Sequence, residues 1–297
     1  MFFALTGALV VASIISIVAF GLHLGIDFTG GTLVEATYPA GKPDAAVLSQ
    51  SLDAAGFKGY SLREFGTPPK DGYILRAGTM TPEMRAGLEK TLSGGGKFPA
   101  TIVQQTEIGP TIGTELRNKS LIALSLVLLC ILLFIAFAFR KVSQPVSSWI
   151  YGLIALVTLV HDVIVPVGFY AALGHFAGAQ VDTLFVTAIL TVLGFSIHDT
   201  IVVFDRVREN LKLNHERNRK EPFEETAGRS LNQTFVRSIN TSLTVLFTLL
   251  VLFLIGPAST RDFALTLLVG IIAGTYSSIF LATPLLVEFG IKKQEKK

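Results

Sequence analysis

The stretch SIHDTIVVFDR, residues 196–206, places His198 and Asp199 side by side inside an apolar run that begins near Thr183. A carboxylate near the centre of a membrane-spanning helix costs ~3 kcal/mol on insertion scales. Such a group persists mainly where it lines a cavity, pairs with a cation or carries an ion. This stretch therefore predicts a membrane protein that has an ionisable functional site within its helices.

The composition supports a membrane protein with six spans. Half of the residues are hydrophobic and 16% are charged, a balance too apolar for a soluble protein of this size. The first apolar stretch has neither a basic n-region nor an A-x-A cleavage site, so we expect a retained helix there and not a signal peptide. Because a span needs roughly 20 mainly apolar residues, six stretches qualify: Phe2–Leu24, Ser120–Phe139, Trp149–Leu173, Thr183–Phe204, Ser238–Ile255 and Phe263–Val287.

The distribution of basic residues predicts the orientation of these spans. Arg140 and Lys141 follow the second span, and further Lys and Arg residues follow the fourth and the sixth, whereas the opposite short loops carry almost none. By the positive-inside rule, both termini lie in the cytoplasm and the long polar segment lies outside. The predicted division is a first transmembrane helix at 1–26, an outer domain at 27–118, a five-helix region at 119–290 with a cytoplasmic loop at 207–229, and a basic tail at 291–297.

The outer segment reads as a small α+β domain. Its strand and helix signals follow the order β-α-β-β-α-β, which is typical of a ferredoxin-like split βαβ fold. In the first strand, Val34, Ala36 and Tyr38 alternate onto one face, and Thr81 is a predicted N-cap before Pro82. The predicted strands are Gly31–Tyr38, Tyr60–Phe65, Tyr73–Ala77 and Pro99–Ile108, and the predicted helices are Pro43–Ala55, with Leu48, Leu52 and Ala55 on one face, and the segment after Thr81.

The sequence offers no signs of an enzyme or of a nucleic-acid binder. It has no nucleophile–base pair, no cluster with metal-ligand spacing and no G-K-[ST] phosphate loop. The net charge of +3 is accounted for by the basic flanks of the spans. Two glycine-rich stretches, Gly25–Thr32 and Gly109–Leu116, are tight turns on the residues alone, one at each end of the outer domain.

The ionisable residues within the spans predict a polar ladder. With a rise of about 1.5 Å per residue, Asp199 lies about 10 Å and Arg237 about 12 Å inside the cytoplasmic edge, so the two can pair. His161 and Asp162 lie deeper, about 21 Å from that edge. A helix shift that separates Asp199 from Arg237 would favour protonation of the carboxylate. His198 projects about 100° away from Asp199 and faces a different neighbour. Purely structural roles for these residues stay open.

A G-x-x-x-G pattern, Gly270 to Gly274, lies in the last span. Such a pattern permits close packing of two helices. The sequence alone leaves open whether the neighbouring helix belongs to this chain or to a partner.

Several blocks resemble the SecF members of the SecD/SecF family of protein-export subunits, part of the RND transporter superfamily. Residues 25–32 resemble the family's G-x-D-F-x-G-G motif, and residues 109–113 resemble its G-P-x-x-G motif. His161–Val163, Asp199–Asn210 and Ser238–Thr244 resemble further family blocks in the same order. Together these matches extend over nearly the whole chain.

The resemblance implies a membrane α-helical fold, namely an RND-type half-transporter with six transmembrane helices and one ferredoxin-like extracytoplasmic domain. The missing half would be SecD, and the pair would act in the bacterial inner membrane beside the SecY-E-G channel, with YajC as a further expected neighbour. It would use the proton gradient, or sodium in some members, to promote late steps in the export of unfolded polypeptides. No other cofactor and no nucleic-acid partner is expected.

The resemblance also implies roles for individual residues. The functional acid of the fourth helix falls on Asp199 and the functional arginine of the fifth on Arg237. His198 stands where the family usually has Asn, so its part in proton transfer stays open. The connectors that would pass motion to the outer domain are Asp27, Gly30 and Gly31 on one side and Gly109, Pro110 and Gly113 on the other.

Two other functions remain on sequence grounds. A stand-alone RND-type proton-coupled exporter of a small molecule would have a related fold, although one outer domain of this size is small for a docking region. A structural scaffold of the translocase that uses no ion predicts that charge-neutral substitutions at Asp199 and Arg237 are silent.

Overall fold

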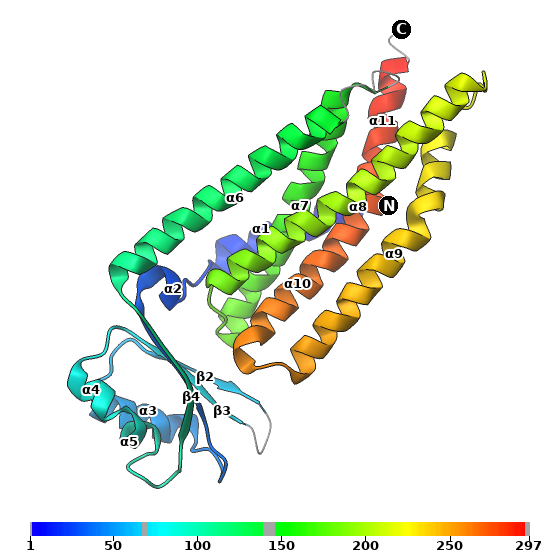
Figure 1. The fold of residues 1–297 in the computed structure, drawn as a ribbon. Helices are drawn as coiled ribbons and strands as arrows, with labels where there is room; N and C mark the ends of the chain where they lie inside the picture. Colours follow the sequence, from blue (N-terminus) through cyan, green and yellow to red (C-terminus); the bar gives the residue numbers. More distant parts are fainter. Residues whose placement is uncertain (1, 67–70, 139–145, 295–297) are drawn as a thin grey trace. The chain divides into compact units, whose positions relative to one another are not determined.

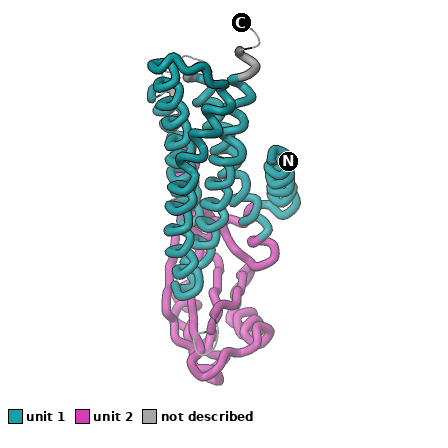
Figure 2. Tube along the Cα trace, turned by 90° about the vertical axis from the view of Figure 1, so that its right-hand side faces the viewer, with its two compact units in different colours: residues 1–21, 123–172, 184–297 teal, residues 22–122, 173–183 magenta. Residues whose placement is uncertain are grey.

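The computed structural model describes residues 2–66, 71–138 and 146–294, and these form two compact units (Figures 1 and 2). The membrane unit lies within residues 1–21, 123–172 and 184–297, and the outer unit comprises residues 22–122 and 173–183. The outer unit is therefore larger than the predicted segment 27–118, because it also includes the turn between the third and fourth spans.

Among the residues that the structure describes, six helices are long and apolar enough to cross a membrane, which confirms the predicted number of spans. The last span is continuous through a π-helical turn, η1, that separates α10 from α11. The helices are α1 (Phe2–Phe20), α6 (Pro110–Ala138), α7 (Ser148–Ala177), α8 (Thr183–Glu216), α9 (Phe223–Ile255) and α10 (Ala258–Ser277), followed by η1 (Ser278–Ala282) and α11 (Thr283–Gln294).

The helices extend further than the apolar runs that predicted them. The segment 207–229, predicted as a loop, is helical except for residues 217–222, because α8 continues to Glu216 and α9 begins at Phe223. Helix α6 begins at Pro110, ten residues before the predicted span. Of the residues used for orientation, Arg140, Lys141 and the end of the tail, 295–297, lie outside the described residues.

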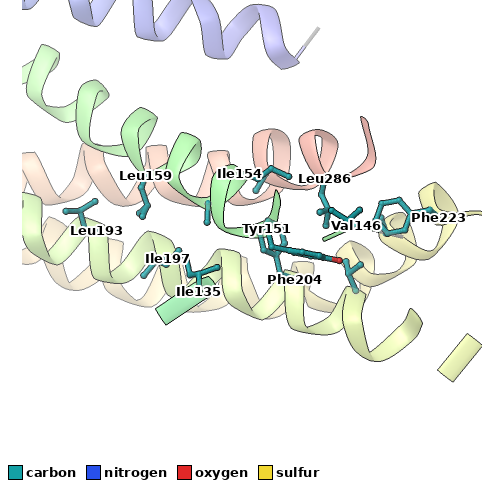
Figure 3. Close-up of a cluster of buried hydrophobic side chains, with 14 residues drawn as sticks. Ile135, Val146, Tyr151, Ile154, Leu159, Leu193, Ile197, Phe204, Phe223 and Leu286 are labelled. Carbon is teal, nitrogen blue, oxygen red and sulfur yellow. The ribbon is translucent and has the colours of Figure 1, made fainter. Parts of the chain in front are cut away.

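A buried apolar cluster joins α6, α7, α8 and α9 to the end of the last span (Figure 3). Tyr151 of α7 and Phe204 of α8 pack edge to face, with ring centroids 5.2 Å apart. Leu193 of α8 and Leu286 of α11 belong to the same cluster. Removing such side chains from contact with lipid gains little hydrophobic energy, so close packing and interhelical hydrogen bonds must specify the arrangement.

The outer unit has the predicted ferredoxin-like topology. Its four antiparallel strands, in the order β2-β3-β1-β4, are β1 (Gly31–Thr37), β2 (Ser61–Phe65), β3 (Gly72–Ala77) and β4 (Thr101–Ile108). Helices α3 (Ala45–Ala54), α4 (Pro82–Ala86) and α5 (Leu88–Leu92) connect them in the β-α-β-β-α-β order.

The predicted face of β1 forms the core of this domain, although Glu35 between its members is buried as well. Val34, Ala36 and Tyr38 are buried together with Leu48 and Leu52 of α3. The prediction that Ala55 shares this face is wrong, because α3 ends at Ala54 and leaves the next residue exposed.

The second predicted helix of the domain is two short ones. Its N-cap is confirmed, since the backbone N–H of Met84 donates to the hydroxyl of Thr81 at 3.3 Å. The helix is interrupted at Gly87, where α4 ends and α5 begins.

Candidate functional site

Asp162 is the most deeply buried carboxylate of the membrane unit and is fully hydrogen-bonded. One of its oxygens accepts from the hydroxyls of Ser196 on α8 and Ser277 on α10, the latter at 2.8 Å. Its other oxygen lies 2.8 Å from Nδ1 of His161. All four side chains are buried, and the Nε2 atom of His161 has no hydrogen-bond partner among the described residues. We call this group the Asp162 cluster.

Asp199 on α8 is also buried, but it is only half satisfied. Ser238 on α9 donates to Oδ1 at 2.5 Å. The other oxygen, Oδ2, is buried and has no hydrogen-bond partner among the described residues. The side chain of Ser278 lies near the carboxylate, and its hydroxyl is 3.0 Å from that of Thr200, with both residues buried. These residues form the Asp199 cluster, which can accept one further donor at Oδ2.

The two clusters lie on shared helices, and Arg237, a member of the predicted ladder, belongs to neither of them. They share α8, which contributes Ser196 to one and Asp199 to the other. They also share the last span, where Ser277 at the end of α10 belongs to the first and Ser278 at the start of η1 to the second. The helix changes to π geometry at Ser278. Single π-helical turns occur frequently at functional sites, and here the turn begins where the last span contributes to both clusters.

Close packing of α8 against α10 brings the polar groups together. A Cβ atom on Gly270 would lie 2.3 Å from a methyl group of Val192, and one on Gly274 would lie 2.9 Å from Cβ of Ser196. The neighbour of the G-x-x-x-G pattern is therefore α8 of the same chain. Because small residues let backbones approach closely, Gly274 places Ser196 within reach of Asp162.

The predicted ion pair between Asp199 and Arg237 is not formed in this structure. Arg237 is exposed, and no nitrogen of its side chain lies within 4.0 Å of the carboxylate. The reason lies in the helical repeat: Ser230, Thr234, Ser238 and Ser242 recur every four residues and are buried, while Arg237 lies about 100° from this stripe. His198 is exposed too, on a face other than that of Asp199, as predicted. The roles of both residues in ion coupling stay predictions.

The serine and threonine partners of the two carboxylates were not predicted as site residues. In α9, small polar residues recur every fourth position from Ser230 to Ser242, and this spacing could have indicated a buried face. Ser230 and Ser238 of that face meet α8, whereas Ser242 meets α10. No comparable pattern marks Ser196 or Ser277, because their role depends on which helices become neighbours.

The two glycine connectors pack against each other within the outer unit. A Cβ on Gly30, whose φ is +77°, would lie 2.7 Å from Cα of Pro110. One on Gly113 would lie 2.8 Å from the backbone nitrogen of Gly30. Gly31 adopts φ +137°, and a Cβ there would lie 2.5 Å from the carbonyl oxygen of Ala77. These glycines therefore permit a backbone contact that no larger residue allows. A Cβ on Gly109, by contrast, would meet open space.

Asp27, the remaining connector residue, accepts two hydrogen bonds. The backbone N–H of Thr183 donates to its Oδ2 at 2.9 Å and the hydroxyl of Thr183 donates at 2.5 Å. It lies on α2 (Ile26–Thr29), a single turn that the sequence did not predict. Thr183 is the first residue of α8, the helix that carries Asp199.

A second polar network fixes the α8–α9 hairpin at the end opposite to Thr183. Glu221, in the connection, accepts from Arg229 at 2.6 Å, from Asn214 at 2.7 Å and from Thr226 at 2.9 Å. Asn210 donates to Ser230 at 2.8 Å. The hydrogen bond from the Arg229 guanidinium, followed by that from Asn214, lowers the pKa of Glu221 to about 2. Many of the polar residues that follow Asp205 in the sequence therefore have a structural role in this network.

Replacing Glu221 with glutamine is expected to destabilise the protein by roughly 1.5 kcal/mol near pH 7, the low end for hydrogen bonds to a charged group, because Arg229 is partly exposed. The folded-state pKa is depressed, so this stability is present above the unfolded pKa near 4.5 and is lost as the pH falls towards about 2. In detergent, the midpoint of thermal unfolding should be lower for Glu221→Gln than for wild type, and this difference should shrink as the pH falls through this window. Glu209→Gln breaks an exposed ion pair with Arg206, and its midpoint of thermal unfolding should be almost the same as that of wild type.

No group of three or more His, Cys, Asp or Glu side chains that could hold a metal ion occurs among the residues that the structure describes. Carboxylate and hydroxyl oxygens predominate in the Asp162 and Asp199 clusters, and of the two carboxylates only Asp199 has an oxygen without a hydrogen-bond partner among the described residues.

The sequence matches two family models. The model for the C-terminal part of the protein export membrane proteins SecD and SecF matches residues 88–292, and the model for the SecD/SecF GG motif matches residues 15–38. The second match contains Asp27, Gly30 and Gly31, and the first contains every residue of both clusters.

Relatives and solved structures agree with these matches. The chain is 44% identical to protein translocase subunit SecF of Thermobaculum terrenum, with 97% of this chain and 91% of the relative covered. It is 38% identical to the same subunit of Anaerolinea thermophila, with equal coverage. The crystal structure of SecDF from Thermus thermophilus, a translocon-associated membrane protein, is similar with a TM-score of 0.81 at 33% identity, covering 96% of this chain and 37% of SecDF.

Proposed function

Because the chain belongs to the SecD/SecF family of protein-export membrane proteins, we propose that it is an accessory subunit of the Sec translocase that uses the proton-motive force to promote late steps of protein export. The chain is a multi-pass membrane protein. Its proposed place is the bacterial inner membrane, with both termini in the cytoplasm and the ferredoxin-like domain outside.

The observation that carries the energy-coupling proposal is the half-satisfied carboxylate of Asp199. Its Oδ2 atom is buried and has no hydrogen-bond partner among the described residues, while Ser238 satisfies Oδ1. A buried unpaired charge is costly, and protonation removes the charge and supplies a donor at the same time. Asp199 is thus suited to hold a proton in one state of the transport cycle and to release it in another.

Release requires an environment that stabilises the ionised carboxylate. Arg237 precedes Ser238 by one residue on α9 and lies about 100° around the helix from it, so a rotation of α9 of that order about its axis would bring the guanidinium towards Asp199 in place of the serine. The proposed cycle alternates between Ser238 beside a protonated Asp199 and Arg237 beside an ionised one. His198, exposed on the other face of α8, is proposed to meet a group outside this chain.

SecD is the proposed principal partner. In Thermus thermophilus, a relative 34% identical to this chain is a single SecDF polypeptide, of which this chain covers 36%. The remaining part would supply the second half of an RND-type transporter. The SecY-E-G channel, YajC, the exported unfolded polypeptide and the lipid bilayer are further proposed partners.

The test is protein export into inverted membrane vesicles that contain SecD, with and without this chain and with the proton gradient intact or collapsed. We expect the gradient to stimulate export only when this chain is present. Stimulation that is independent of the chain would contradict the proposal. Gradient-driven efflux of small dyes from vesicles that hold this chain alone would favour the stand-alone exporter instead.

A further inference from the structure

The first residue of α8, Thr183, belongs to the outer unit, whereas the helix belongs to the membrane unit from Leu184 onward. Residues 173–183, which join α7 to α8, belong to the outer unit together with residues 22–122. The outer unit therefore contains the first residue of the helix that carries Asp199. This division raises the question of which contacts hold the turn.

The backbone between α1 and the outer sheet pairs with the turn. Leu24 and Val181 form an isolated parallel β-bridge. The N–H of Gly25 donates to the carbonyl of Val181 at 2.8 Å, and the N–H of Val181 donates to the carbonyl of His23 at 2.7 Å. A Cβ on Gly25 would lie 3.1 Å from the carbonyl oxygen of Val181, so the glycine permits this approach.

The carboxylate of Asp27 then completes the attachment. By accepting from both the backbone N–H and the hydroxyl of Thr183, it satisfies one of the donors that the first turn of a helix leaves unpaired. Its negative charge also lies at the positive end of the helix dipole. Asp27 therefore caps α8 from a distant part of the sequence, 156 residues away.

The same carboxylate belongs to the connector that enters the sheet. Asp27 is on α2, and β1 begins at Gly31, four residues later. From the cap, α8 runs without interruption to Glu216 and reaches Asp199 after 16 residues, about 24 Å along its axis. The helix that begins in the outer unit is therefore the helix that carries Asp199.

We propose that Asp27, through Thr183, is the positioning residue that makes the outer domain and α8 move as one body, so that the domain and the protonation state of Asp199 are coupled through a single helix. The inference rests on the proposed function and adds to it the contact through which force passes. Asp27 touches neither the proton nor the exported chain.

The first experiment compares Asp27→Asn, Thr183→Val and Thr183→Ser in vesicles that contain SecD. Coupling free energies between sites usually correspond to factors of about 5 to 150, so we expect Asp27→Asn to lower gradient-stimulated export at least about fivefold, with gradient-independent export unchanged. Thr183→Ser, which keeps the hydroxyl, should retain wild-type stimulation, and Thr183→Val should lie between the two. Asp44→Asn is the matched control, because Asp44 occupies the N-cap of α3 without a side-chain hydrogen bond, and it should be silent.

A second readout does not depend on activity. Hydrogen exchange of the purified protein should be faster in the first turn of α8 for Asp27→Asn than for wild type, and unchanged there for Asp44→Asn. If exchange and stimulation both stay at wild-type levels in Asp27→Asn while Asp199→Asn loses stimulation, the cap is not part of the coupling and the inference fails. If Asp199→Asn is silent as well, the proposed function itself fails.

A disulfide lock tests whether the attachment acts as a rigid link. Leu24→Cys and Val181→Cys, with Cys130→Ser to remove the native thiol, place two thiols on paired strands about 4.8 Å apart, which a disulfide can bridge. The oxidised lock should leave wild-type export unchanged and should restore stimulation to Asp27→Asn, and reduction should abolish that rescue. Loss of export in the locked wild type would show that the attachment must open, which would overturn the inference.

Discussion

Replacing Asp199 with asparagine should abolish the gradient-driven part of protein export and leave gradient-independent export intact. Asparagine keeps the shape of the side chain and can still accept from Ser238, whose bond to Asp199 is 2.5 Å long. The uncharged amide NH2 group takes the place of Oδ2, which in Asp199 has no hydrogen-bond partner among the described residues. The variant thus resembles the protonated state and cannot return to the ionised one, so a cycle that needs both states stops.

The effect should be large because Asp162, the other buried carboxylate of the two clusters, has both oxygens paired. Asp162 is held by Ser196, Ser277 and His161 and has no free acceptor of the kind that Asp199 has. We expect gradient stimulation to fall to the level of vesicles that lack this chain, with normal amounts of the SecD complex on gels.

Asp205→Asn is the control for Asp199→Asn. Asp205 lies on the same helix, but its side chain is 66% exposed and its pair with Arg208 is 3.7 Å long. Exposed pairs of this kind contribute little, so this variant should behave as wild type. Equal stimulation in the two variants would show that the buried carboxylate is structural, and the scaffold function would then be favoured.

Replacing Gly270 with leucine should have the second large effect, on assembly itself. A Cβ at this position would lie 2.3 Å from one methyl group of Val192 and 3.0 Å from the other. Val192 is β-branched and buried, so its side chain has few alternative rotamers. Overpacking of this kind typically costs about 1 to 3 kcal/mol, and leucine adds three further carbon atoms beyond the Cβ.

The consequence for the site follows from the geometry of α8 and α10. If α10 moves away from α8, the hydroxyl groups of Ser196 and Ser277 can no longer both reach Asp162. A buried carboxylate that loses its donors is costly, so destabilisation by overpacking and by lost hydrogen bonds should add. We expect a clearly lower midpoint of thermal unfolding in detergent and a loss of gradient-stimulated export.

Gly194→Leu is the matched control for Gly270→Leu. Gly194 lies on α8 between Val192 and Ser196, and a Cβ there would meet nothing within 4 Å. The same substitution at this exposed position should leave the unfolding midpoint near that of wild type or raise it, because glycine is the poorer helix former. A similar loss in both variants would mean that the G-x-x-x-G contact is not what orders the two clusters.

Local patterns in the sequence were sufficient for most of the fold. Six apolar stretches predict six spans because the bilayer requires that length from any helix that crosses it. Strand alternation and the cap at Thr81 predict the ferredoxin-like order, since burial on one face imposes a period of two. His161, Asp162 and Asp199 stand out as site candidates because ionisable groups are costly in an apolar run.

The partners of these groups were decided by the tertiary structure. Asp199 meets Ser238 and not Arg237 because the rotation of α9 about its axis, and not depth alone, determines which residue faces α8. Asp27 caps a helix that begins 156 residues later, a contact that arises only after the chain has folded. Sequence patterns report on one helix or strand at a time, whereas contacts between them depend on packing, and packing settled which hydroxyl groups surround each carboxylate.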